Sequence, residues 1–292
     1  MEITAFAKLK EGPASDRLNY WLYLKIGLVV ALICLLYTRI LTDLAMDWWN
    51  EPALSQGMLI PPFAAYLAWL RREVTFAHPV KPDNRGLFLI ILACLILLVG
   101  KLAVEFFLMR ISFVILLAAL AWTFWGMARL RTLAFPFLLL ATMVPLPGIV
   151  YNALAAPLQL FASDIATRLA QLLGVTVYRD GNIIQLAYTS LGVVEACSGL
   201  NSLSALIIAS LLLGYLICWR LLTRIFLLAL SIPLAIAVNV LRVTGTAVLA
   251  DYNQEFAMGF YHSFSGWLVF LVGFGALYVF ARAIRFVLES NR

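Results

Sequence analysis

Long apolar segments follow one another along nearly the whole chain, and they constrain the possible fold more than any other sequence feature. A helix needs about 20 mostly apolar residues to cross the roughly 30 Å hydrocarbon core of a membrane. Eight segments are candidates, at about 21–42, 56–70, 87–105, 110–128, 133–150, 198–218, 225–249 and 260–281. Because 64% of the residues are hydrophobic and only 12% charged, one water-soluble core cannot enclose them. The sequence predicts an all-α membrane protein, a bundle of about eight spans forming a single polytopic domain over 1–292.

The distribution of Lys and Arg predicts the orientation of this bundle. With eight spans, 15 of the 21 basic residues fall in the terminal segments and loops of one side. Since basic residues accumulate in cytoplasmic loops, we expect both termini in the cytoplasm. This asymmetry also accounts for the net charge of +6. The basic residues form no cluster interleaved with aromatic residues, so the sequence does not favour binding of nucleic acid.

The expected topology leaves one long insert, about 151–197, on the outer face. Its first part, Pro157 to Leu173, repeats apolar residues at helical spacing and predicts an amphipathic helix at the membrane interface. The pair Asp180-Gly181 then separates two runs rich in β-forming residues, at 175–178 and 183–186, which predicts a β-hairpin. The insert ends at a cysteine that we expect at the start of the next span.

That cysteine, Cys197, differs from the other three. Cys34, Cys94 and Cys218 lie within or at the edge of apolar segments, where a thiol usually acts as a small hydrophobic side chain. Cys197 is predicted at a helix start, where the helix dipole favours a thiolate, and small neighbours leave its sulfur approachable. It has no evident disulfide partner on its face of the membrane. A packed structural cysteine at a helix end is the alternative interpretation.

Arg242 lies in an otherwise apolar segment, toward its outer end. An arginine within a span is costly, so it usually marks a functional site and faces the interior of the bundle. Asn239 and Thr246 share a helix face with it, three residues before and four residues after. The alternative interpretation is an arginine whose side chain extends to the outer head groups.

His262 opens the last predicted span on the same outer side. A single interfacial histidine is more often structural than catalytic, but three predicted segments bring Cys197, Arg242 and His262 to one membrane boundary. A thiol, an imidazole and a guanidinium together offer a nucleophile, a proton carrier and an oxyanion stabiliser. No His or Cys pair has the spacing of metal ligands, and nothing in the sequence requires an organic cofactor.

These residues stand in motifs that resemble those of the exosortase/archaeosortase family, which consists of multi-pass membrane transpeptidases. The motifs are Glu195-Ala196-Cys197-Ser198-Gly199-Leu200, Asn239-Val240-Leu241-Arg242-Val243, and His262 followed by Phe264-Ser265-Gly266-Trp267. Upstream, Ser55-Gln56-Gly57 through Pro62 and Val144-Pro145-Leu146-Pro147 are similar to the family as well. The chain departs from many members in having Gln56 where they have His, and Asn201 where they have a basic residue.

The resemblance implies a cysteine transpeptidase in which Cys197 is the nucleophile, His262 transfers protons and Arg242 stabilises the oxyanion. It implies substrates that are secreted proteins with a C-terminal sorting tail, comprising a short motif such as Pro-Glu-Pro, a transmembrane helix and a basic cluster. The acceptor would be a surface glycan or a lipid-linked molecule. It also implies a bacterial inner membrane, with the site facing the periplasm. Four further residues are candidates for substrate binding or support of the catalytic groups: Glu195, Ser198, Asn201 and Asn239.

The same sequence features are compatible with three other functions. A transporter or channel also places arginine and asparagine within spans, and it predicts that Cys197 can be replaced without loss. A plain membrane cysteine protease shares the first half-reaction and releases its product to water. A non-catalytic assembly scaffold predicts no thioester at all.

Overall fold

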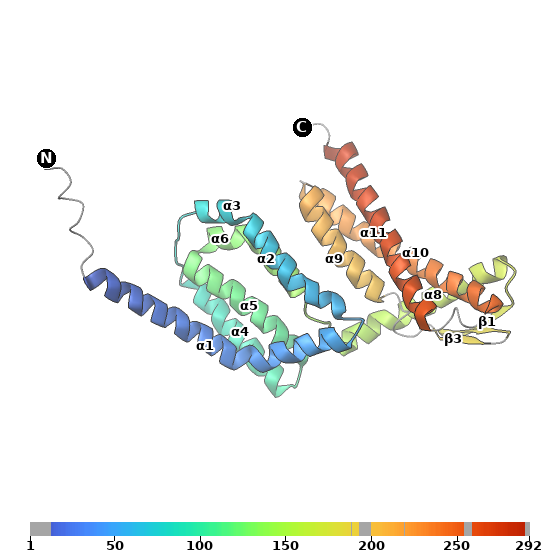
Figure 1. The fold of residues 1–292 in the computed structure, drawn as a ribbon, viewed down its shortest axis with the longest axis horizontal. Helices are drawn as coiled ribbons and strands as arrows, with labels where there is room; N and C mark the ends of the chain where they lie inside the picture. Colours follow the sequence, from blue (N-terminus) through green and yellow to red (C-terminus); the bar gives the residue numbers. More distant parts are fainter. Residues whose placement is uncertain (1–12, 188, 193–199, 219, 254–258, 290–292) are drawn as a thin grey trace.

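The computed structural model describes residues 13–187, 189–192, 200–218, 220–253 and 259–289. It is an all-α membrane protein with one small sheet (Figure 1). The first seven helices are α1 (Pro13–Asn50), the 3₁₀ helix η2 (Ser55–Leu59), α2 (Ile60–Leu70), α3 (Arg72–Ala77), α4 (Arg85–Leu102), α5 (Phe106–Trp125) and α6 (Met127–Thr132). There follow α7 (Ala134–Ala141), α8 (Gly148–Leu172), β1 (Val177–Asp180), β2 (Ile183–Leu186), β3 (Ser190–Gly192), α9 (Leu200–Ile217), α10 (Leu221–Tyr252) and α11 (Gly259–Glu289).

Within the described residues, six helices are long and apolar enough to cross a membrane by length and composition, where about eight spans were expected. The six lie in α1, α4, α5, α8, α10 and α11, and α9 is a shorter apolar helix. The span expected at 56–70 is a 3₁₀ turn followed by the 11 residues of α2. The span expected at 133–150 is wrong, because α7 ends at Ala141 and α8 begins at Gly148. Pro145 and Pro147 explain this break, since a proline disfavours helical backbone in the residue before it.

The helix α8 is longer than the amphipathic helix expected from Pro157 to Leu173. It begins at Gly148 and carries Pro157 in its interior. Its length and composition are those of a candidate span, although its mean hydropathy is the lowest of the six. The helical spacing of apolar residues predicts the helix correctly, but Pro157 lies within the helix and does not mark its start.

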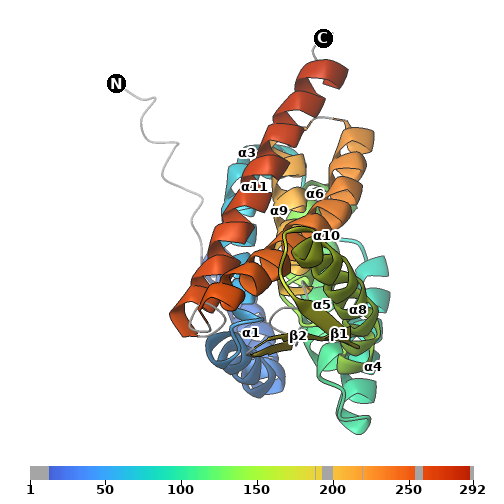
Figure 2. The ribbon, with the colours of Figure 1, turned by 90° about the vertical axis from the view of Figure 1, so that its right-hand side faces the viewer.

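The predicted hairpin is confirmed with its turn one residue later than expected. Asp180 pairs with Ile183 in the antiparallel ladder of β1 and β2, so Gly181 and Asn182 form the two-residue turn. Gly181 has a φ of 60°, which glycine adopts without the steric cost that a side chain brings. A third strand, β3, pairs antiparallel with β2 and completes a sheet in the order β1-β2-β3. Figure 2 shows β1 and β2 beside α8. This third strand was not predicted.

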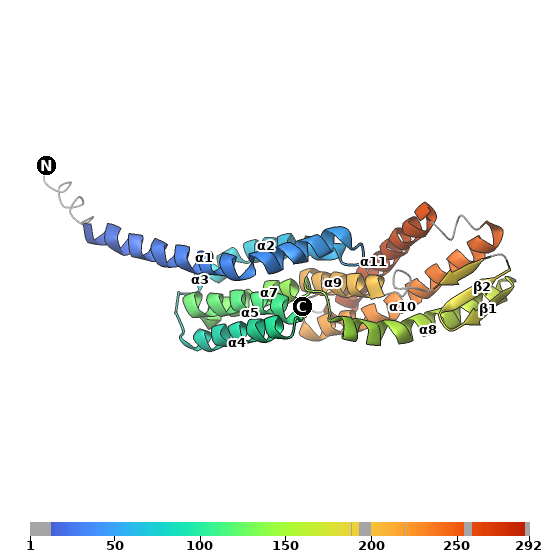
Figure 3. The same cartoon turned by 90° about the horizontal axis from the view of Figure 1, so that it is seen from below.

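The helices form two groups, α1–α7 and α8–α11, which lie side by side along the molecule (Figure 3). Within the second group, α9 also packs against the first. Ile208, Leu212 and Tyr215 recur at helical spacing and pack against the core that α1, α2, α5 and α7 share. Leu206 and Leu213, on another face of α9, belong to the core formed with α10 and α11. The position of α9 therefore determines how the two groups fit together.

Candidate active site

The guanidinium of Arg242 in α10 lies directly against α11 at Gly266. A β-carbon added to Gly266 would stand 3.1 Å from both Cζ and Nη2 of Arg242. Because real β-carbons rarely approach other atoms so closely, the absence of a side chain at Gly266 is what gives the guanidinium its space. The side chain is half-buried between the helices, as expected of an arginine that faces the bundle.

The contacts of Gly273 fix the relative depth of α9, α10 and α11. A β-carbon at Gly273 would stand 3.2 Å from Leu206 Cδ1 and 3.6 Å from Val238 Cγ1, so these residues share one level. With a rise of about 1.5 Å per residue, the start of α9, Arg242 and Gly266 lie about 6–10 Å beyond that level. All three lie on the same side of it, because α10 runs antiparallel to both neighbours. We call this region the Asn201 end of α9.

Asn239, one turn from Arg242 along α10, is buried with 2% of its surface exposed. Thr246 donates a hydrogen bond from Oγ1 to the carbonyl oxygen of Arg242 at 2.9 Å. The shared face that the sequence predicted for Asn239, Arg242 and Thr246 is therefore part of a single unbroken helix. An amide so deeply buried beside a guanidinium forms part of the polar interior of this end of the bundle.

Gln56 of η2 also reaches this end of the bundle. Its Nε2 donates a hydrogen bond to Ser204 Oγ at 2.7 Å, and Ser204 Oγ in turn donates to the carbonyl oxygen of Asn201 at 3.0 Å. The resemblance had singled out Gln56 and Asn201 as departures from the family. The structure brings them together through Ser204, a residue that the sequence analysis overlooked because a serine in an apolar helix carries little signal.

Several predicted site residues lie outside the described residues. Cys197, Glu195 and Ser198 belong to the segment 193–199, which precedes α9. The backbone of His262 belongs to α11, but its side chain is outside the described part of the chain. His262 precedes Gly266 by one helical turn, which places its backbone about 6 Å along α11 from the contact with Arg242.

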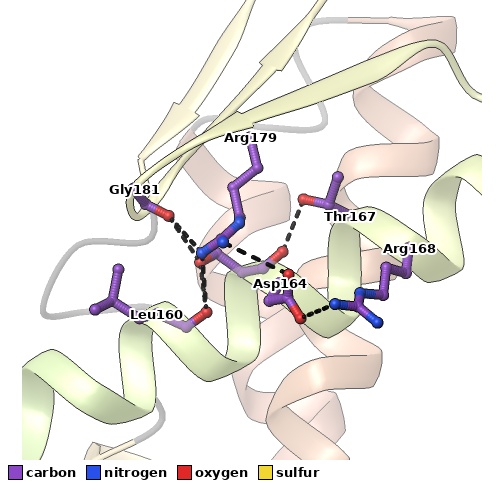
Figure 4. Close-up of polar contacts among 7 residues, drawn as sticks. Leu160, Asp164, Thr167, Arg168, Arg179 and Gly181 are labelled. Carbon is purple, nitrogen blue, oxygen red and sulfur yellow. Dashed lines mark hydrogen bonds and ion pairs between the residues drawn. The ribbon is translucent and has the colours of Figure 1, made fainter.

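The β-hairpin is attached to α8 by a set of polar contacts (Figure 4). Asp164 forms ion pairs with Arg168 at 3.0 Å and with Arg179 at 3.5 Å. The guanidinium of Arg179 also donates to the carbonyl oxygen of Gly181 at 3.2 Å, and Ser163 Oγ bonds to the same oxygen at 3.2 Å. The hairpin also packs through Ile184, which is fully buried in a core with residues of α8 and α10. The hairpin is therefore held close to the helix that carries Arg242.

The structure distinguishes the three other cysteines from one another. Cys218 is buried in the core of α9, α10 and α11 with 1% of its surface exposed, as expected of a small hydrophobic side chain. Cys34 and Cys94 are exposed on α1 and α4. Both lie in helices of membrane-spanning length, so their exposed side chains point outward from the helix bundle.

A second intramembrane arginine escaped the sequence analysis. Arg110 in α5 is buried and forms an ion pair with Asp47 of α1. Its signal was the one that identified Arg242, namely an arginine inside an apolar segment. The pair joins two helices of the first group. Because the carboxylate offsets the cost of burying the guanidinium, this arginine has a structural role.

Taken together, the fold is that of a multi-pass membrane protein with polar side chains gathered at one end of three packed helices. Residues 48–279 match the family described as transmembrane exosortase. This match covers most of the chain, and the protein therefore belongs to the transmembrane exosortase family. Membership identifies it in general terms as a membrane-embedded enzyme that processes sorting signals. No curated protein and no solved structure matches the chain significantly.

Proposed function

We propose that this protein is a cysteine transpeptidase that cleaves the C-terminal sorting tail of secreted proteins through a thioester on Cys197. The observation that carries the proposal is the position of Arg242. Its guanidinium lies against α11 one helical turn from His262, and at the depth where α9 begins, three residues after Cys197. In the proposed site, three segments that are distant in sequence supply a thiol, an imidazole and a guanidinium to one region.

In the proposed first half-reaction, the thiolate of Cys197 attacks the carbonyl carbon of the scissile peptide bond. The C–S bond forms, and Arg242 donates hydrogen bonds to the oxyanion that develops on the carbonyl oxygen. The C–N bond then breaks, and His262 gives its proton to the leaving amine. The products are a thioester on Cys197 and the released tail, with His262 neutral.

The second half-reaction passes the acyl group to an acceptor. His262 removes a proton from an amine or hydroxyl group, which attacks the thioester carbon and restores the thiolate of Cys197. A surface glycan or a lipid-linked molecule is the proposed acceptor. Asn239, buried one turn from Arg242, is proposed to orient the guanidinium. Glu195, Ser198 and Asn201 are proposed to support the thiol and the imidazole or to contact the substrate.

The sheet and α8 are proposed to form the surface on which the recognition motif of the tail docks. Its attachment through Asp164 and Arg179 supports this role, because a rigid surface beside a site positions a substrate more accurately than a loop does. We further propose that the protein lies in a bacterial inner membrane with this surface outside and both termini in the cytoplasm. The basic loops support that orientation.

Co-expression with a tail-bearing secreted substrate tests the proposal. Wild-type protein is expected to shorten the substrate, whereas Cys197→Ala, Arg242→Ala and His262→Ala are each expected to reduce cleavage by about 100-fold or more. Each variant must first be shown to be folded and inserted. The mass of the product then separates transfer from hydrolysis. Continued cleavage by Cys197→Ala would exclude the thiol mechanism, whereas no cleavage by the wild-type protein would favour the transporter or scaffold interpretation.

A further inference from the structure

The opposite end of α9 carries an unusual arrangement around Tyr215. Phe135 of α7 stacks on the Tyr215 ring with the two planes 1° apart and the centroids separated by 3.9 Å. Two arginines approach the same ring, with Cζ of Arg71 5.2 Å and Cζ of Arg224 5.3 Å from its centroid. One aromatic ring therefore gathers two positive charges from different parts of the chain. We call this region the Tyr215 end of α9.

Neither guanidinium has an acidic partner among the residues that the structure describes. No carboxylate in that part of the chain lies within 4.0 Å of Arg71 or Arg224, although other arginines do form such pairs. Arg224 uses its Nε to donate to the carbonyl oxygen of Cys218 at 3.0 Å, which leaves its two terminal nitrogens for another acceptor. Two like charges attracted to one ring repel each other, so an anion between them would be stabilised.

The location of the Tyr215 end suits an anion at the membrane surface. Arg71 follows the last residue of α2, Tyr215 lies in the last turn of α9, and Arg224 lies in the first turn of α10. In Figure 1, α2 ends beside α3 toward the upper edge, where the C-terminal half of α11 also lies. Arg71 is exposed and Arg224 half-buried, so an acceptor can reach both.

We propose that Arg71 and Arg224 bind the phosphate of an anionic phospholipid at the junction of α2, α9 and α10. A guanidinium presents a planar pair of donors that matches phosphate oxygens, and Tyr215 holds both groups in place. The neighbouring Leu216 and Leu222 are 58% and 79% exposed and provide apolar surface for acyl chains. That combination selects a lipid over free phosphate, because only the lipid contacts both surfaces.

The proposed lipid would connect the two groups of helices, because Arg71 belongs to the first group and Arg224 to the second. Binding to the folded protein alone stabilises it by mass action, so anionic lipid should raise the temperature of unfolding. This inference does not depend on the chemistry proposed for Cys197, and its test uses no substrate.

The full-length protein is reconstituted in nanodiscs of phosphatidylcholine alone or with phosphatidylglycerol, and bound lipid is measured by native mass spectrometry. Wild-type protein is expected to retain phosphatidylglycerol in preference to phosphatidylcholine and to unfold at a higher temperature in its presence. Arg71→Gln with Arg224→Gln is expected to weaken this binding by at least about tenfold, the effect of two basic residues at a membrane surface. Arg131→Gln with Arg282→Gln, two exposed arginines, removes the same charge as a matched control.

If the two double variants lose phosphatidylglycerol binding to the same extent, net charge alone explains the binding and the proposed site is wrong. Inorganic phosphate that competes with phosphatidylglycerol, or stabilises the protein equally in phosphatidylcholine, would overturn the lipid as the ligand. If the double variant fails to fold, Arg71→Gln alone carries the test, since this side chain is exposed and follows the end of α2. It is expected to weaken lipid binding by about threefold to fivefold, and unchanged binding would overturn the proposal.

Discussion

The two ends of α9 both carry arginine at a junction of helices, but they hold it in different ways. At the Asn201 end, Arg242 lies far from either end of α10 and its guanidinium packs against Gly266. A β-carbon added to Gly266 would be only 3.1 Å from Cζ of Arg242. At the Tyr215 end, Arg71 and Arg224 approach one ring from helix termini, with Cζ more than 5 Å from its centroid. At the Asn201 end, close packing fixes the position of one guanidinium. At the Tyr215 end, one ring brings two positive charges close together.

This difference shows that burial alone does not identify the purpose of an arginine. A guanidinium far from a helix end is costly, so evolution retains it where its geometry matters. Basic residues at helix ends are common beside head groups and act largely through charge. Arg110 is a third case, in which a partly exposed carboxylate partner offsets the cost of burying the guanidinium.

The same substitution at the two ends gives the largest expected contrast. Arg242→Lys should reduce tail cleavage by about 100-fold, because an ammonium lacks the planar donors proposed to meet the oxyanion. Arg71→Lys with Arg224→Lys should weaken phosphatidylglycerol binding by only about threefold, because lysine keeps both charges and loses only the planar pairs of donors. Cleavage assays and native mass spectrometry measure the two effects. Similar sensitivity at both ends would remove the distinction between them.

The contact at Gly266 gives the next largest effect. Gly266→Ala places a methyl group against Arg242, so the guanidinium must shift by a few tenths of an ångström, and cleavage should fall by about tenfold. Gly275→Ala in the same helix is the matched control, because nothing lies within 4 Å of its added β-carbon. That control should keep full activity. Full activity of Gly266→Ala would show that the position of Arg242 is not critical.

The smallest expected effect concerns the hydrogen bond between Gln56 and Ser204. Gln56→Ala and Ser204→Ala, made singly and together, should show a coupling of about 1 kcal/mol in the free energy of unfolding in mixed detergent micelles. Gln56→Ala combined with Ser55→Ala is the control, since the Ser55 hydroxyl bonds only to the nearby Pro52 carbonyl at 2.9 Å. Additive losses for Gln56 and Ser204 would mean that this bond does not hold the Asn201 end together.

Individual elements show which kinds of sequence signal were reliable. The long helices α4, α5, α10 and α11 followed from apolar length alone, because lipid forces a spanning backbone to satisfy its own hydrogen bonds. The hairpin followed from a turn glycine between β-forming runs, within one residue. The break between α7 and α8 was missed because Pro145 and Pro147 were counted inside an apolar segment. The third strand carries too few residues to give a pattern.

The sequence by itself determined that this protein is a multi-pass membrane protein, and its motifs indicated the exosortase family that the match confirms. These properties depend on composition and on short runs of neighbouring residues. The contacts of Arg242 with Gly266, of Gln56 with Ser204 and of two arginines with Tyr215 were decided only by the tertiary structure. Each joins segments from different helices, and their approach depends on how ridges and small residues on those helices pack. Apolar periodicity predicts that a helix has a buried face but does not specify which helix will cover it.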